Sequence, residues 1–197
     1  MQTVTGQEFW QHASKIGISI DQDYSDSFEL AINPSHGHSR FWTLPTNIGV
    51  WPHFAVSVLS CIDKWDSGYL WPRFGKYPVS ELSSSHNDSV RDFILRGAGV
   101  PSGWPGALRF NTEEKYALIT VMFAFMSFSW SGNDDLYFVP DHGQQLVQLN
   151  HHKVIHVECT SEDRMILLVS QMLEAGYKLP TNPPDWTFIR PAWMNNA

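Results

Sequence analysis

Acidic and histidine side chains gather near the C-terminal end of this sequence, and they are its residues best suited to do chemistry. Carboxylates and imidazoles bind zinc, iron or manganese, and they also act as general acids and bases. A metal centre and an acid–base centre are therefore both open interpretations of this region. The set comprises Asp134, Asp135, Asp141, His142, His151, His152, His156 and Glu158.

A predicted three-strand antiparallel meander over 135–159 divides this set, because its turns at 140–143 and 150–152 lie at opposite ends of the middle strand. A strand of six residues is about 20 Å long at ~3.3 Å per residue, so the two turns cannot share one ion. Within the third strand, His156 and Glu158 share a face because side chains alternate.

The meander returns Asp134 and Asp135 to the end of the sheet that holds His151 and His152. These four residues form the candidate catalytic or metal-binding site. Turn chemistry explains the same residue types without a function, since Asp, Asn and His are common in polar turns. No spacing among them is diagnostic of a metal in the way that a CxxC pair would be.

A second candidate site lies in the irregular segment predicted over 66–86. Trp, Tyr and Arg are enriched among the residues that dominate the binding energy of protein interfaces, and a long loop inside a domain is often functional. The alternative is that these rings cover the core beneath the loop. The candidate partner-binding residues are Trp71, Arg73, Phe74, Lys76 and Tyr77.

Composition excludes several classes of function. The formal net charge is −7 with only 13 Lys and Arg, which argues against a nucleic-acid partner. The glycines at 97 and 99 follow a predicted helix, so they do not form a phosphate-binding loop between a strand and a helix. Cys61 and Cys159 belong to no CxxC motif, and neither a GxSxG nor an HExxH motif is present. We therefore predict no cofactor.

The apolar stretch at 116–128 is shorter than the ~18–20 residues that cross a bilayer, so we predict a buried core helix and no membrane partner. The N-terminus has no basic region followed by an apolar run, and a cytoplasmic location is expected. The remaining elements follow from hydrophobic periodicity and caps. Helices are predicted over 5–16, 51–65, 87–96, 113–128 and 160–175, a hairpin over 28–32 and 39–44, and a short strand over 107–110.

Together these elements predict a single α+β domain over 1–197, in which about four to five helices pack on an antiparallel sheet. Residues 180–197 form a Pro- and Trp-rich tail laid on the body. This acidic α+β layout, clearest over 135–159, resembles small bacterial immunity proteins of toxin systems. The resemblance implies a cofactor-free module that binds another protein, a toxin in that family. Our functional prediction is accordingly an intracellular protein-binding module of an immunity-like or regulatory kind, and the alternative is a hydrolase built on the Asp/His quartet.

Overall fold

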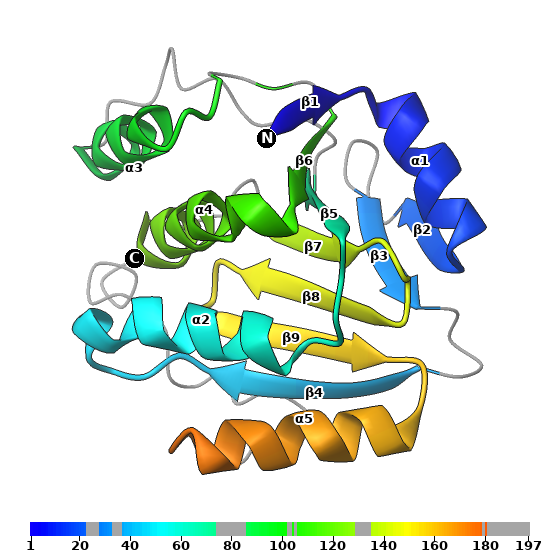
Figure 1. Ribbon diagram of the computed structural model, residues 1–197. Helices are drawn as coiled ribbons and strands as arrows, with labels where there is room; N and C mark the ends of the chain where they lie inside the picture. Colours follow the sequence, from blue (N-terminus) through cyan, green and yellow to red (C-terminus); the bar gives the residue numbers. More distant parts are fainter. Residues whose placement is uncertain are drawn as a thin grey trace, which may run out of the picture.

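An antiparallel sheet of seven strands runs through the molecule (Figure 1). The computed structural model describes residues 1–22, 28–32, 37–73, 86–101, 104, 106–128, 135–178 and 180. From one edge to the other, the strands are β1 (Gln2–Val4), β6 (Ala107–Asn111), β5 (Ser67–Pro72), β7 (Leu136–Pro140), β8 (Gln145–Asn150), β9 (Val154–Cys159) and β4 (His38–Thr43).

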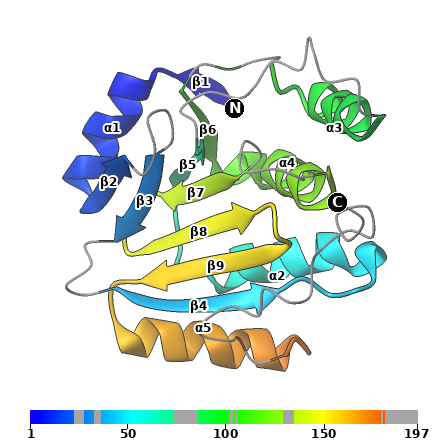
Figure 2. The same ribbon diagram turned by 180° about the vertical axis from the view of Figure 1, so that it is seen from behind.

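Helices cover one face of the sheet, and a helix with a hairpin covers the other (Figures 1 and 2). The first layer holds α2 (Trp51–Cys61), α4 (Lys115–Phe128) and α5 (Glu162–Glu174), with α3 (His86–Gly97) packed on α4. The second holds α1 (Gly6–Lys15) and the two-stranded sheet of β2 (Ile18–Gln22) and β3 (Phe28–Ile32). Short 3-10 turns at Ile48–Val50 and Thr112–Glu114 precede α2 and α4.

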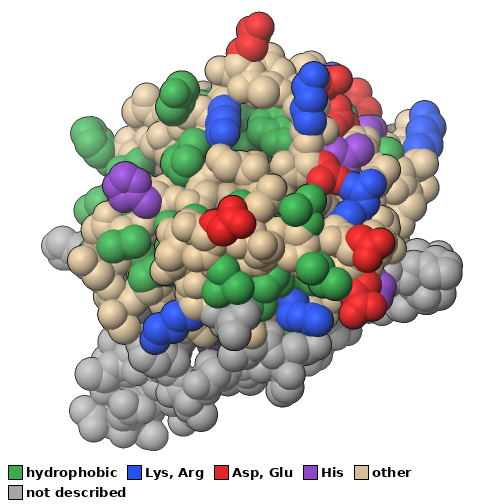
Figure 3. All heavy atoms as spheres, turned by 60° about the horizontal axis from the view of Figure 1, so that its bottom comes forward, with side chains coloured by type: hydrophobic (Ala, Val, Ile, Leu, Met, Phe, Trp, Pro, Cys, Tyr) green, Lys and Arg blue, Asp and Glu red, His purple; other side chains and the backbone are tan. Residues whose placement is uncertain are grey.

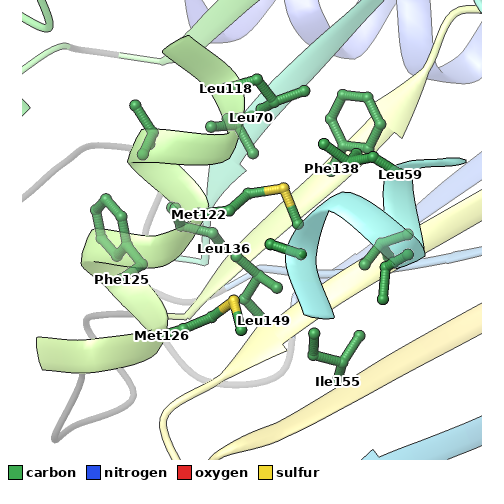
Figure 4. Close-up of a cluster of buried hydrophobic side chains, with 14 of the residues drawn as sticks. Leu59, Leu70, Leu118, Met122, Phe125, Met126, Leu136, Phe138, Leu149 and Ile155 are labelled. Atoms are coloured by element: carbon green, nitrogen blue, oxygen red, sulfur yellow. The ribbon is translucent and has the colours of Figure 1, made fainter. Parts of the chain in front are cut away.

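Side chains alternate between the two faces of the sheet and form two hydrophobic cores, one on each face. In β7, Leu136 and Phe138 enter the core beneath α2, α4 and α5, whereas Tyr137 and Val139 enter the core beneath α1 and the β2–β3 hairpin. Figure 4 shows the larger core, where α4 meets β7, β8 and β9. The α4 helix buries most of its surface, and its sequence is therefore an almost continuous apolar run, as expected for a helix enclosed by its neighbours.

The helix caps and the C-terminal meander agree with the sequence predictions. Thr5 and Glu8 form a reciprocal capping box at the start of α1, and Ser161 caps α5 by accepting from the Arg164 amide. The strands β7, β8 and β9 are consecutive neighbours, so the meander is confirmed. The α+β class is confirmed with it.

Two strand predictions were wrong. The segment 39–44 does not pair with 28–32, because β4 pairs with β9 and β3 pairs with β2. The segment predicted as irregular over 66–86 begins with β5, a strand in the middle of the sheet, while 74–85 lie outside the described residues. Turn-forming Pro and Gly residues surround β5, so its apolar run was not recognised as a strand in the sequence.

Among the described residues, no helix combines the length and apolar content needed to cross a bilayer. Cys61 and Cys159 are both free thiols. The predicted tail over 180–197 lies outside the described residues, apart from residue 180.

Candidate functional site

The meander brings Asp135 and His151 into direct contact. Asp135 immediately precedes β7, and His151 begins the turn between β8 and β9 at the same end of the sheet. The Asp135 Oδ1 atom accepts from the His151 backbone amide at 2.7 Å and lies 2.8 Å from His151 Nδ1. The predicted proximity is therefore confirmed for these two residues, and Asp134 lies outside the described residues.

Asp135 is fully buried, and a guanidinium offsets its charge. Arg73 places its Nη1 atom 3.5 Å from Asp135 Oδ2, and its backbone amide donates to the Asp135 carbonyl at 3.0 Å. The same guanidinium holds Glu29 Oε1, in β3, at 2.9 Å. A chain of polar contacts from Glu29 through Arg73 and Asp135 to His151 thus links the β2–β3 hairpin to the β8–β9 turn. The sequence prediction missed Glu29 and assigned Arg73 to a different site, because these residues are far apart along the chain.

The contact with Asp135 defines the chemistry that His151 can perform. A carboxylate only accepts hydrogen bonds, so Nδ1 of His151 donates to Asp135, and in the neutral form of the ring Nε2 holds the lone pair. The His151 side chain is 20% exposed, so this ring is partly open to solvent. The arrangement fits a proton acceptor whose tautomer is set by a buried acid.

His152 lies against His151, with ring centroids 4.0 Å apart. Burial lowers the pKa of His152, and the neighbouring His151 lowers it further, while Asp135 opposes both effects. Three of the four predicted residues are thus adjacent. Within the described part of the chain, however, no three His, Cys, Asp or Glu side chains form a group that could hold a metal ion. The Nδ1 atom of His151 is engaged by Asp135 and is not free to act as a ligand.

The turn at the opposite end of β8 has a packing role. Asp141 Oδ2 accepts from the Ser67 amide at 2.9 Å, and His142 Nδ1 accepts from the Gln144 amide at 3.0 Å. Gly143 has φ +64°, and a Cβ atom there would lie 2.2 Å from the Ile16 carbonyl oxygen. These contacts fasten the β7–β8 turn to β5 and to the end of α1.

His156 and Glu158 share a face of β9, as predicted, and lie where β3 crosses the sheet. Glu158 Oε2 accepts from the Ile32 amide at 2.8 Å, and His156 stacks on Phe41 of β4 with ring centroids 4.3 Å apart. Burial lowers the pKa of His156 to about 4 and raises the pKa of Glu158. His156 Nε2 and Glu158 Oε1 are 3.7 Å apart, which is too long for a hydrogen bond.

In the structure, two members of the predicted partner-binding site make contacts within the protein. Trp71 is only 1% exposed and stacks on Phe9 of α1, with ring centroids 4.4 Å apart and planes 10° from parallel. Its ring fills the smaller core, which removes Trp71 from the predicted partner-binding set. The Arg73 side chain is engaged by two carboxylates. The other three members of the set, Phe74, Lys76 and Tyr77, lie outside the described residues.

The outward side of α5 carries a surface that the sequence prediction missed. Met165, Leu168 and Met172 face the core, as expected for an amphipathic helix. The opposite side nevertheless exposes three large apolar side chains around Ser170. We call this surface the α5 outer face. It comprises Ser170 together with Ile166, Leu167 and Leu173, which are 59%, 54% and 43% exposed.

Comparison with known proteins finds no match among family models, curated proteins or solved structures.

Proposed function

We propose that this protein is a protein-binding module whose docking surface is the α5 outer face. The supporting observation is that α5 exposes three large apolar side chains on its outward side, although a surface helix normally keeps that side polar. Contiguous exposed apolar side chains with a polar rim are typical of interaction sites. Figure 3 views the molecule from the side that α5 occupies, where apolar side chains lie among charged ones.

The proposed action is binding without catalysis or a cofactor, in the cytoplasm. An immunity-type inhibitor that neutralises one toxin is the specific form implied by the resemblance in layout. Ile166 and Leu173 are two helical turns apart, or about 10 Å at 1.5 Å per residue, so both can contact the same partner. Anchors of this kind supply most of the binding energy of an interface, while the rim excludes water.

Affinity capture from native lysate tests the proposal with a matched pair of variants. The double variant Ile166→Ser/Leu173→Ser removes two anchors that contribute little to folding, because both are exposed. The control Val90→Ser changes a similarly exposed apolar side chain (46%) on α3. We expect one protein to be captured equally by the wild type and the control and about tenfold less by the double variant. Equal capture of every protein by all three would contradict the proposal.

The Asp135–His151 contact favours a second candidate function, an acid–base hydrolase. The 2.8 Å contact fixes the His151 tautomer and leaves Nε2 to accept a proton from water. The candidate residues remain Asp135, His151 and His152, with Asp134 outside the described part of the chain. A structural reading competes with it, since Asp135 also satisfies the backbone of the β8–β9 turn.

Activity assays separate these two readings. Hydrolysis of activated carboxylic and phosphate esters is to be measured for the wild type, His151→Gln and the control His38→Gln. An acid–base centre predicts a rate that falls by about 10²-fold or more in His151→Gln and is unchanged in the control. A wild-type rate equal to the buffer blank for every ester would exclude the hydrolase.

A further inference from the structure

The charges around the α5 outer face indicate what kind of partner fits it. Glu162 and Asp163 lie exposed at its N-terminal end, and Glu174 lies exposed at its C-terminal end. The cation on this helix, Arg164, is ion-paired with Asp63, and Lys178 follows the helix after its last turn. The apolar centre is therefore bounded at both ends by carboxylates.

We infer that the partner is another protein with a basic surface around an apolar patch, an inference that rests on the proposed function. Carboxylates at the rim attract Lys and Arg side chains, which speeds association and disfavours acidic partners. Glu162 and Asp163 also favour the positive end of the helix dipole, but Glu174, near the opposite end, gains nothing from it. The helix dipole therefore does not explain all of the carboxylates in the rim.

A second copy of the chain fits this surface poorly. Two-fold docking of α5 on α5 would bring the carboxylates of one copy toward those of the other in a chain of net charge −7, and like charges across an interface oppose binding. A stable interface buries ~800 Å² per partner, and three side chains on two helical turns cover only part of that area. A partner of ordinary interface size would therefore also contact the acidic rim.

A membrane surface fits it poorly as well. Helices that lie in the membrane interface carry Lys and Arg on their polar side, because the headgroups of the cytoplasmic leaflet are anionic. The α5 outer face instead presents Glu162, Asp163 and Glu174 beside its apolar side chains. Anionic lipid would repel this rim.

Site-specific photo-crosslinking in native cells tests the inference. The photoreactive residue p-benzoyl-phenylalanine replaces Ser170, at the centre of the α5 outer face, and Ser14, which is exposed on α1, serves as the control position. The crosslinked peptide is then identified by mass spectrometry. We expect position 170 alone to crosslink to a segment of a different protein that is rich in Lys and Arg.

The possible outcomes separate the inference from the proposed function. A crosslink from position 170 to an acidic or neutral segment of another protein would overturn the basic-partner inference and leave the proposed function standing. A crosslink to lipid or to a second copy, or no crosslink at position 170, would overturn both. With the identified partner, Glu162→Gln/Asp163→Asn/Glu174→Gln should slow association about tenfold at low salt, and an unchanged rate would also contradict the basic partner.

Discussion

At the scale of single residues, Asp135 connects three distant parts of the chain. It receives the Arg73 guanidinium after β5, the His151 amide and ring after β8, and the Asn150 side chain, whose Nδ2 atom is 3.5 Å away. The sequence predicted that Asp135 and His151 would be close, because the meander alternates direction. It could not predict Arg73 or Glu29, since their proximity depends on how β5 and β3 meet the meander.

Substitution of Asp135 measures the stability that this network contributes. Asp135→Ala leaves buried donors without an acceptor and Arg73 without its buried counter-ion, so we expect a loss of about 3–5 kcal/mol in the free energy of unfolding. Asp135→Asn keeps one oxygen acceptor and should lose about 1–3 kcal/mol. Urea unfolding monitored by circular dichroism provides the measurement.

The exposed Asp66 is the control for this substitution, and Asp66→Asn should stay within about 0.5 kcal/mol of the wild type. A loss at Asp135 no larger than the loss at Asp66 would show that the network adds nothing to stability.

Helices and strands that carry a local sequence signal were predicted, whereas strand pairings that depend on the tertiary fold were not. The helices α1 and α5 carry caps, and β7 to β9 alternate in a regular way between turns, so the sequence specifies them. The β3–β4 hairpin was a reasonable local prediction, but β4 pairs with β9, more than a hundred residues away. Periodicity can identify a strand, yet it cannot choose its partner.

The strand β5 supplies a test at this scale, because it needs a glycine where it pairs with β7. A Cβ atom at Gly68 would lie 2.5 Å from the ring of Phe138, which is fully buried. Gly68→Ala must displace that ring and should cost about 1–3 kcal/mol.

Gly97, at the end of α3, is the matched control, since a Cβ atom there meets nothing within 4 Å. Gly97→Ala should stabilise the protein by about 0.4–1 kcal/mol. Thermal unfolding of both variants gives the comparison, and a Gly68→Ala variant as stable as the wild type would mean that β5 and β7 are not packed this closely.

At the scale of the whole molecule, histidines with lowered pKa values couple folding to pH. His156 is stacked on Phe41 with its pKa lowered to about 4, and burial also lowers the pKa values of His12, His142 and His152. The burial of His156 could not be predicted from the sequence, because it depends on β3 lying against β9. The exposed apolar side chains of α5 could not be predicted either, because apolar residues on several sides of a helix do not reveal which side is covered.

The sign of this coupling follows from where the protons bind. The unfolded chain protonates His156 near its ordinary pKa of 6.5, whereas the folded chain does so only near 4, so the unfolded state holds more protons between these values. The stability associated with neutral His156 is complete above pH 6.5 and is lost as the pH falls toward 4, by about 3 kcal/mol at most. Glu158 acts in the opposite sense, since its raised pKa lets the folded state take up a proton more readily, and it offsets part of the loss.

His156→Phe isolates the contribution of this histidine, because it keeps a ring on Phe41 and removes the titrating group. Urea unfolding between pH 4 and 8 should show a shallower pH dependence for this variant than for the wild type, with the curves separating below pH 6.5. If the His156→Phe curve instead ran parallel to the wild-type curve, the acid sensitivity would belong to the other buried histidines, and His156 would be a packing residue with no part in the response to pH.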